Sequence, residues 1–145
     1  MQLHRVKLVN FRQHAETELV LGLGLTAVIG PNGSGKTTIL EAVAWALYGN
    51  PAARGSRDSL RRIGAPARAP VRVEVDFSLG AHEYRVVRSL YGAELFQDAG
   101  EGPVANSHQS VSHKIVRLLG MTHDEFFSTY FTGQKELAVM ASMGP

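Results

Sequence analysis

Apolar and polar residues alternate along one stretch of this chain in the manner of a strand. Across residues 71–79 every second position is apolar, and the positions between them are polar or charged. This alternation predicts a strand with one buried face and one wet face. Turn residues at 80–82 and 91–92 bound two further segments, 83–90 and 93–97. We therefore expect the three segments to form an antiparallel meander.

Upstream of the meander, the pattern predicts three more strands and a helix. Residues 3–9 and 17–21 have strand-like patterns, and the apolar run at 25–29 is bounded by glycines, as expected for a buried strand. Residues 37–47 are apolar on nearly all sides, and Glu41 is their one charged residue. Such a segment predicts a buried helix.

The last third of the chain predicts helices. A helical stripe of apolar residues runs through 110–119, and Gly120 follows it as a stop signal. Residues 122–125 have the form of a capping box, which predicts a short helix that ends at residue 127. A final helix is expected from about residue 136.

Composition narrows the class of protein. The chain has 145 residues, of which 44% are hydrophobic, so one ordinary domain with a core is expected. It has no cysteine, which excludes disulfides and Cys-ligated zinc, and the spacing of its six histidines does not suggest a metal site. No apolar run is long enough to span a membrane, and the N-terminus does not resemble a signal peptide. We expect a cytoplasmic protein with no membrane partner.

Positive charge is concentrated in one segment. The formal net charge is only +2, but six arginines fall within residues 54–72 and are opposed only by Asp58. Residues 50–70 are also rich in Ala, Gly and Pro, which predicts a loop with a short helix near 58–60. Two interpretations remain open for this segment: a solvated loop, or a surface that contacts a phosphate backbone.

The most specific motif occupies residues 30–38, which fit the phosphate-loop pattern G-x-x-x-x-G-K-[ST]. It stands between the strand expected at 25–29 and the helix expected from 37. The glycines let backbone N–H groups turn toward a phosphate, and the helix N-terminus adds a partial positive charge there. Lys36 is expected to reach the outer phosphates, and the Thr37 hydroxyl is expected to hold Mg²⁺.

A phosphate loop binds nucleotide, but hydrolysis also needs an acidic residue after a second buried strand. The best candidate segment is 71–76, and its alternation indicates a half-exposed antiparallel strand instead. We therefore expect this chain to be part of an ATPase rather than all of one.

Several segments of the chain resemble those of a known family, the Rad50/SbcC ATPases of DNA repair. Residues 9–14 are similar to the family's N-F-R-x-H segment, and 31–49 to its phosphate loop and following helix. Residues 84–88 resemble a strand of its meander, and 131–136 stand where the family has its Q-loop. Lys135 departs from the family, which more usually has Gly there. The resemblance spans the whole chain and is specific to the N-terminal lobe of the ATPase head.

The resemblance implies an α/β fold: an ABC-ATPase-like P-loop NTPase lobe with a mixed sheet, an antiparallel meander and flanking helices. Residues 1–145 would be the N-terminal half of the head, ending near the start of a coiled coil. The C-terminal half would supply the signature and Walker B motifs. Two heads would bind two ATP molecules with Mg²⁺, bind double-stranded DNA and pair with an Mre11- or SbcD-like nuclease. The complete dimer would hydrolyse ATP, and this half alone would bind ATP weakly without turnover.

Site residues are carried over by position. Lys36 and Gln134 are expected to take part in catalysis, and Thr37 and Gln134 to coordinate Mg²⁺. Arg12 would contact the phosphates or ribose of the nucleotide, to which its fork of donors is suited. The full set expected to bind nucleotide is Arg12, Asn32, Gly33, Ser34, Gly35, Lys36, Thr37, Thr38, Arg61, Arg62 and Ile63.

Other ATPase classes share the phosphate loop. An ABC transporter domain is disfavoured because Lys36 and Gln134 lie 98 residues apart, whereas transporters place the Q-loop a few tens of residues after the phosphate loop. An SMC-type or RecF-like head is the closer alternative. Residues 45–49 and the arginine-rich segment favour Rad50/SbcC over both.

Overall fold

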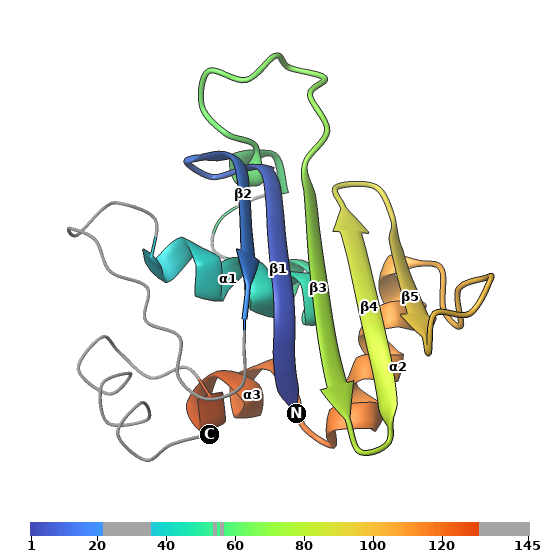
Figure 1. The fold of residues 1–145 in the computed structure, drawn as a ribbon. Helices are drawn as coiled ribbons and strands as arrows, with labels where there is room; N and C mark the ends of the chain where they lie inside the picture. Colours follow the sequence, from blue (N-terminus) through green and yellow to red (C-terminus); the bar gives the residue numbers. More distant parts are fainter. Residues whose placement is uncertain (22–35, 54, 56, 131–145) are drawn as a thin grey trace.

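The computed structural model describes residues 1–21, 36–53, 55 and 57–130. Five of its strands form one sheet in the order β2-β1-β3-β4-β5, and each strand is antiparallel to its neighbours (Figure 1). The strands are β1 (Gln2–Phe11), β2 (His14–Val20), β3 (Arg72–Leu79), β4 (His82–Ser89) and β5 (Ala93–Gln97). The meander and the two upstream strands are thus confirmed. The mixed sheet remains a prediction, because the strand expected at 25–29 lies outside the described residues.

Helix α1 (Lys36–Tyr48) confirms the predicted buried helix. It packs across one face of the sheet, where the apolar residues of β1, β3 and β4 point, and residues 41–49 are all buried (Figure 1). Trp45 and Leu47 are fully buried within this core. Uniform burial follows from the sequence, since the helix has apolar residues on every side.

The opposite face of β3 is less wet than its alternation predicts. Glu74 is only 8% exposed. Its carboxylate lies 3.6 Å from Arg5 Nη1 and 3.5 Å from Arg72 Nε, so charged side chains of β1 and β3 cover it. Alternation predicted the orientation of Glu74 correctly, but burial also depends on the length of the neighbouring side chains.

Two helices follow the meander. Helix α2 (His108–Leu119) begins at a capping box between Ser107 and Ser110 and ends at Gly120, whose φ of 71° is left-handed. Helix α3 (His123–Tyr130) begins with the predicted capping box: Thr122 N donates to Glu125 Oε1, and Glu125 N donates to Thr122 Oγ1. The prediction that this helix ends at 127 was wrong, since it continues for another three residues. None of the described helices is long and apolar enough to cross a bilayer.

Two 3-10 helices lie between α1 and β3. The first, η1 (Asn50–Ala52), follows Gly49 directly after α1. The second, η2 (Arg57–Leu60), confirms the short helix predicted near 58–60. The rest of this connection leads to β3 above the upper end of the sheet in Figure 1.

A buried arginine joins β4 to the C-terminal end of α1. Arg88 is 0% exposed. Its Nε donates to Ala46 O at 2.9 Å, and its Nη2 donates to Leu47 O at 3.3 Å and to Ser112 Oγ at 3.1 Å. Ser112 Oγ in turn donates to Tyr48 O at 2.9 Å. Arg88 and Ser112 thus satisfy three carbonyls that the end of a helix leaves without intrahelical partners.

No carboxylate of the described residues forms an ion pair with Arg88. The negative end of the α1 dipole takes that place, because cations are stabilised beside the last carbonyls of a helix. Burial lowers the pKa of Arg88 to about 10, so the guanidinium stays protonated at neutral pH.

Replacing Arg88 with Met should therefore destabilise the protein by about 3 kcal/mol or more, because each buried carbonyl left unsatisfied costs roughly 1–3 kcal/mol. Urea unfolding at pH 7 measures this difference. Arg68→Met is the matched control, since Arg68 is exposed and its replacement should change stability by less than about 0.5 kcal/mol. Equal effects of the two substitutions would contradict the role assigned to Arg88.

Candidate functional site

The site is built around the tip of the β1–β2 hairpin, residues 10–14. Phe11 is fully buried there, with its ring 5.5 Å from that of Trp45 in α1. Asn10 and Arg12, on either side of Phe11, have left-handed φ values of 51° and 54°. Asparagine tolerates this conformation, but a long side chain such as that of Arg12 rarely adopts it. A non-glycine residue in this region costs on the order of 1–3 kcal/mol and persists only where its surroundings hold it.

Two polar contacts attach the tip to α1. One edge of the Arg12 guanidinium binds both oxygens of the Glu41 carboxylate: Nε lies 3.0 Å from Oε1, and Nη2 lies 3.0 Å from Oε2. The next residue of the tip, Gln13, accepts a hydrogen bond at its Oε1 from the Thr38 hydroxyl, at 3.1 Å. Thr38 and Glu41 are three residues apart, so they share one face of the helix.

The segment after η2 pairs with the same tip. Arg12 N donates to Leu60 O at 2.7 Å, and Arg62 N donates to Asn10 O at 2.9 Å. Phe11 and Arg61 form an isolated antiparallel bridge between these contacts. Arg12 Nη1 also donates to Ser59 O at 3.0 Å. The hairpin tip thus joins two segments that are distant in sequence, the first turns of α1 and residues 59–62.

Five of the residues expected to bind nucleotide have described side chains. Arg12 and Thr38 lie at the contact between the tip and α1, and the three consecutive residues 61–63 pair with or follow the tip. Arg61 Nε donates to Ala69 O at 3.2 Å, and Ile63 is 95% exposed. Arg62 Nε is buried and has no hydrogen-bond partner among the described residues. The fold therefore brings together segments that the resemblance assigned to one site.

The other residues expected in the site lie partly or wholly outside what the structure describes. Only the backbone of Lys36 and Thr37 is described, as the first two residues of α1. Asn32, Gly33, Ser34, Gly35 and Gln134 lie outside the described residues. Their expected roles stay predictions.

The electrostatics at the start of α1 suit an anion. The first turn of the helix contains no acidic residue, and its N-terminal end carries a partial positive charge. The Arg12 guanidinium lies on the face of α1 that Thr38 and Glu41 share, where the Glu41 carboxylate balances its charge. Phosphate groups therefore fit the chemistry of this end of the helix. Among the described residues, no group of three or more potential metal ligands is clustered. Coordination of Mg²⁺ by Thr37 and Gln134 stays a prediction.

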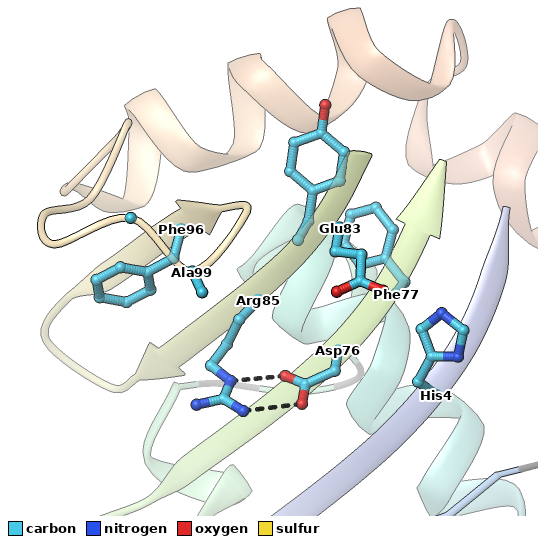
Figure 2. Close-up of a pocket in the computed structure, with 9 residues that line it drawn as sticks. His4, Asp76, Phe77, Glu83, Arg85, Phe96 and Ala99 are labelled. Carbon is cyan, nitrogen blue, oxygen red and sulfur yellow. Dashed lines mark hydrogen bonds and ion pairs between the residues drawn. The ribbon is translucent and has the colours of Figure 1, made fainter. Parts of the chain in front are cut away.

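A separate cavity of about 510 Å³ lies on the other face of the sheet (Figure 2). His4, Asp76, Glu83, Arg85 and Phe96 are among the residues that line it. Figure 2 shows Arg85 and Asp76 facing one another, with Nε and Nη2 at 2.8 and 3.0 Å from the two carboxylate oxygens. The hydrogen bond that Arg85 donates to the Asp76 carboxylate raises the pKa of Arg85. None of its lining residues belongs to the expected nucleotide site.

Reasoning from sequence missed two members of the tip contact, Gln13 and Ser59. In the sequence, Glu41 is only the one charged residue of an apolar helix, and no role follows from that alone. That isolated charge was the available signal, because a carboxylate on a fully buried helix requires a partner. Nothing in the sequence identified Arg12 as that partner.

Comparison with known proteins gives a consistent assignment. A family model described as an AAA domain matches residues 5–134. The DNA double-strand break repair Rad50 ATPase of Methanocaldococcus jannaschii is 30% identical over 149 aligned residues, which cover all of this chain and 14% of that protein. The Rad50 ATPase of Methanopyrus kandleri is 34% identical over 146 residues, covering 94% of this chain and 16% of that protein. The chain therefore spans only a small part of the length of these relatives.

A third relative is of a different kind. The DNA replication and repair protein RecF of Brucella abortus is 37% identical over 76 residues, which cover 52% of this chain and 20% of that protein. The Rad50 match from Methanocaldococcus jannaschii extends over the whole chain, whereas this match extends over half of it. Together with the sheet and its flanking helices, the matches confirm the expected α/β P-loop ATPase lobe and the resemblance to the Rad50/SbcC family.

Proposed function

This chain belongs to the AAA domain family, and we propose that it is the ATP-binding half of a Rad50-type ATPase head. The observation that carries the proposal is the contact between the hairpin tip and the helix that follows the phosphate-loop motif. Arg12 and Gln13 touch that helix at Glu41 and Thr38, within its first two turns. A guanidinium, paired with the Glu41 carboxylate, therefore lies near the end of the helix to which the motif would bring a phosphate.

The residues take separate roles in this proposal. Lys36 neutralises the outer phosphates, and the N-terminal end of α1 adds its dipole. Thr37 and Gln134 hold Mg²⁺, which would neutralise charge on the phosphates when bound. Arg12 contacts the phosphates or the ribose, and residues 61–63 lie beside the base.

Hydrolysis needs parts that this half does not supply. An acidic residue after a buried strand is required to hold Mg²⁺ and polarise water. The described carboxylates of β3 lie instead on the outer face of an antiparallel sheet, in ion pairs with Arg5, Arg72 and Arg85. We propose that the C-terminal half of the head supplies the Walker B and signature motifs, and that two heads close around two ATP molecules to control a partner nuclease.

An SMC- or RecF-like head remains the second candidate, supported by the partial similarity to RecF. The two candidates share the nucleotide site and differ in what the rest of the head carries. A zinc-hook C-x-x-C motif at the apex of the coiled coil would favour the Rad50 type, and a globular hinge there would favour the SMC type.

The first test is Mg²⁺-dependent ATP turnover by residues 1–145, alone and mixed with the C-terminal half of the head. We expect no turnover by residues 1–145 alone and turnover by the mixture, because the acidic and signature motifs would then be present.

Lys36→Ala should abolish ATP binding by the mixture, as measured by calorimetry, whereas Lys114→Ala in α2 should leave it unchanged. Turnover by this half alone, or unchanged binding by Lys36→Ala, would refute the proposal.

We propose that the arginine-rich segment, residues 54–72, contacts DNA. Arg68 is exposed, and Arg72 is half exposed with its Nε 3.5 Å from Glu74 Oε2. The carboxylates on the outer face of the sheet are paired with basic side chains of the same face, in Arg5–Glu18, Lys7–Glu16 and Arg85–Asp76, so the exposed arginines of this segment would provide the positive charge at this end of the lobe.

Arg68→Gln and Arg72→Gln should weaken DNA binding by the assembled head and make its dependence on salt less steep. Removing one phosphate contact reduces the steepness of log K against log [salt] by about 0.9. Arg61 and Arg62 are left in place because they are candidates for nucleotide contact. Arg117→Gln, on an exposed position of α2, is the control. A salt slope that is the same in all three variants and the unchanged protein would argue against a DNA contact here.

A further inference from the structure

Helix α1 contains a carboxylate where the packing of a buried helix would favour an apolar residue. Glu41 is 5% exposed and is surrounded along the helix by residues of the core. Burying a carboxylate and a guanidinium costs several kcal/mol per ion, which only good geometry and further hydrogen bonds can offset. Replacing such pairs with apolar residues is often neutral or stabilising, so stability alone does not account for Glu41.

The geometry of the pair restricts Arg12 closely. Glu41 accepts from Nε and Nη2 in a bidentate fork, and the Ser59 carbonyl accepts from Nη1. All three nitrogens of the guanidinium are thus held by acceptors on two different elements, α1 and η2. The backbone of Arg12 is fixed as well, in a left-handed conformation with its N–H on Leu60 O. A planar guanidinium held in this way has a defined orientation.

The contact between Gln13 and Thr38 fixes the tip against the same face of α1. Thr38 directly follows the Lys36-Thr37 pair of the phosphate-loop motif. The distance along the helix between Thr38 and Glu41 is three residues, about 4.5 Å at the usual helical rise. The Arg12–Glu41 pair therefore lies within two helical turns of the residues expected to hold the phosphates.

From these contacts we propose that Glu41 is a positioning residue for nucleotide binding, acting through Arg12. Its carboxylate holds the guanidinium in the orientation in which Arg12 meets the nucleotide. This inference rests on the proposed ATP-binding function. It assigns Glu41 a role that differs from holding the helix in place, because the effect of Glu41 on nucleotide affinity should then depend on Arg12 being present.

A double-mutant cycle on ATP affinity separates the two roles. The assembled head is prepared unchanged and as Glu41→Gln, Arg12→Gln and the double variant, and ATP dissociation constants are measured by calorimetry. Glu41→Gln keeps the size of the side chain but loses the charge-assisted fork, so we expect the dissociation constant to rise about tenfold. In the Arg12→Gln background the same substitution should have no further effect.

The chain offers a matched control pair. Arg85 and Asp76 form the same bidentate arrangement on the opposite face of the sheet, at 2.8 and 3.0 Å. Asp76→Asn removes the charge of that carboxylate and should leave ATP affinity unchanged. Glu41→Asp is a second variant in case Glu41→Gln does not fold: it keeps the charge, withdraws the carboxylate by one methylene and should also weaken ATP binding. Thermal unfolding of every variant is measured beside the affinity.

Each outcome decides between the roles. A loss of affinity on Glu41→Gln that disappears in the Arg12→Gln background supports positioning. An equal loss in both backgrounds would mean that Glu41 acts on the helix itself, and unchanged affinity on Glu41→Gln or Glu41→Asp would mean that the pair has no part in binding; either result overturns the inference. If the unchanged head does not bind ATP, the proposed function fails as a whole, which is a distinguishable result.

Discussion

Helix α1 is buried from Glu41 to its end, so the Glu41 carboxylate and the last carbonyls of the helix have to be satisfied within the protein. At its C-terminal end, the Arg88 guanidinium and the Ser112 hydroxyl bind the last three carbonyls. Near its N-terminal end, the hairpin tip binds Thr38 and Glu41. The sheet, α2 and the tip of the hairpin therefore all contact this helix.

The same requirement explains why the site combines distant segments. Positive φ values are common in tight hairpin turns, but here they fall on Asn10 and Arg12, neither of which is a glycine. The local cost is offset by contacts to α1 and to residues 60–62, with Phe11 packed against Trp45 beneath them. Strain of this kind is found where the surroundings fix a conformation that function uses.

The sequence predicted those features that depend on local patterns. Alternation across 71–79 defined β3, uniform apolarity defined α1, and Thr122 with Glu125 defined the start of α3, because each signal lies within a few neighbouring residues. The phosphate-loop pattern and the resemblance identified the residues of the site but not how Arg12 and Glu41 meet. That contact joins positions 29 residues apart, and no local pattern encodes such a pairing.

Arg88 shows most clearly what local sequence patterns could not predict. In the sequence it belongs to the segment 83–90, which turn residues define, and its charge suggests an exposed position. Its burial is favourable only because the carbonyl end of α1 meets β4 at that point, which is a property of the tertiary fold.

Tyr48, the last residue of α1, packs its ring 5.4 Å from Phe126 in α3 and donates its hydroxyl to Met121 O. The two ends of α1 thus contact different parts of the lobe, the hairpin tip at one end and α2 and α3 at the other. Because a close-packed interior does not deform continuously, a shift of α1 at the tip would have to be accommodated at Arg88 and Tyr48.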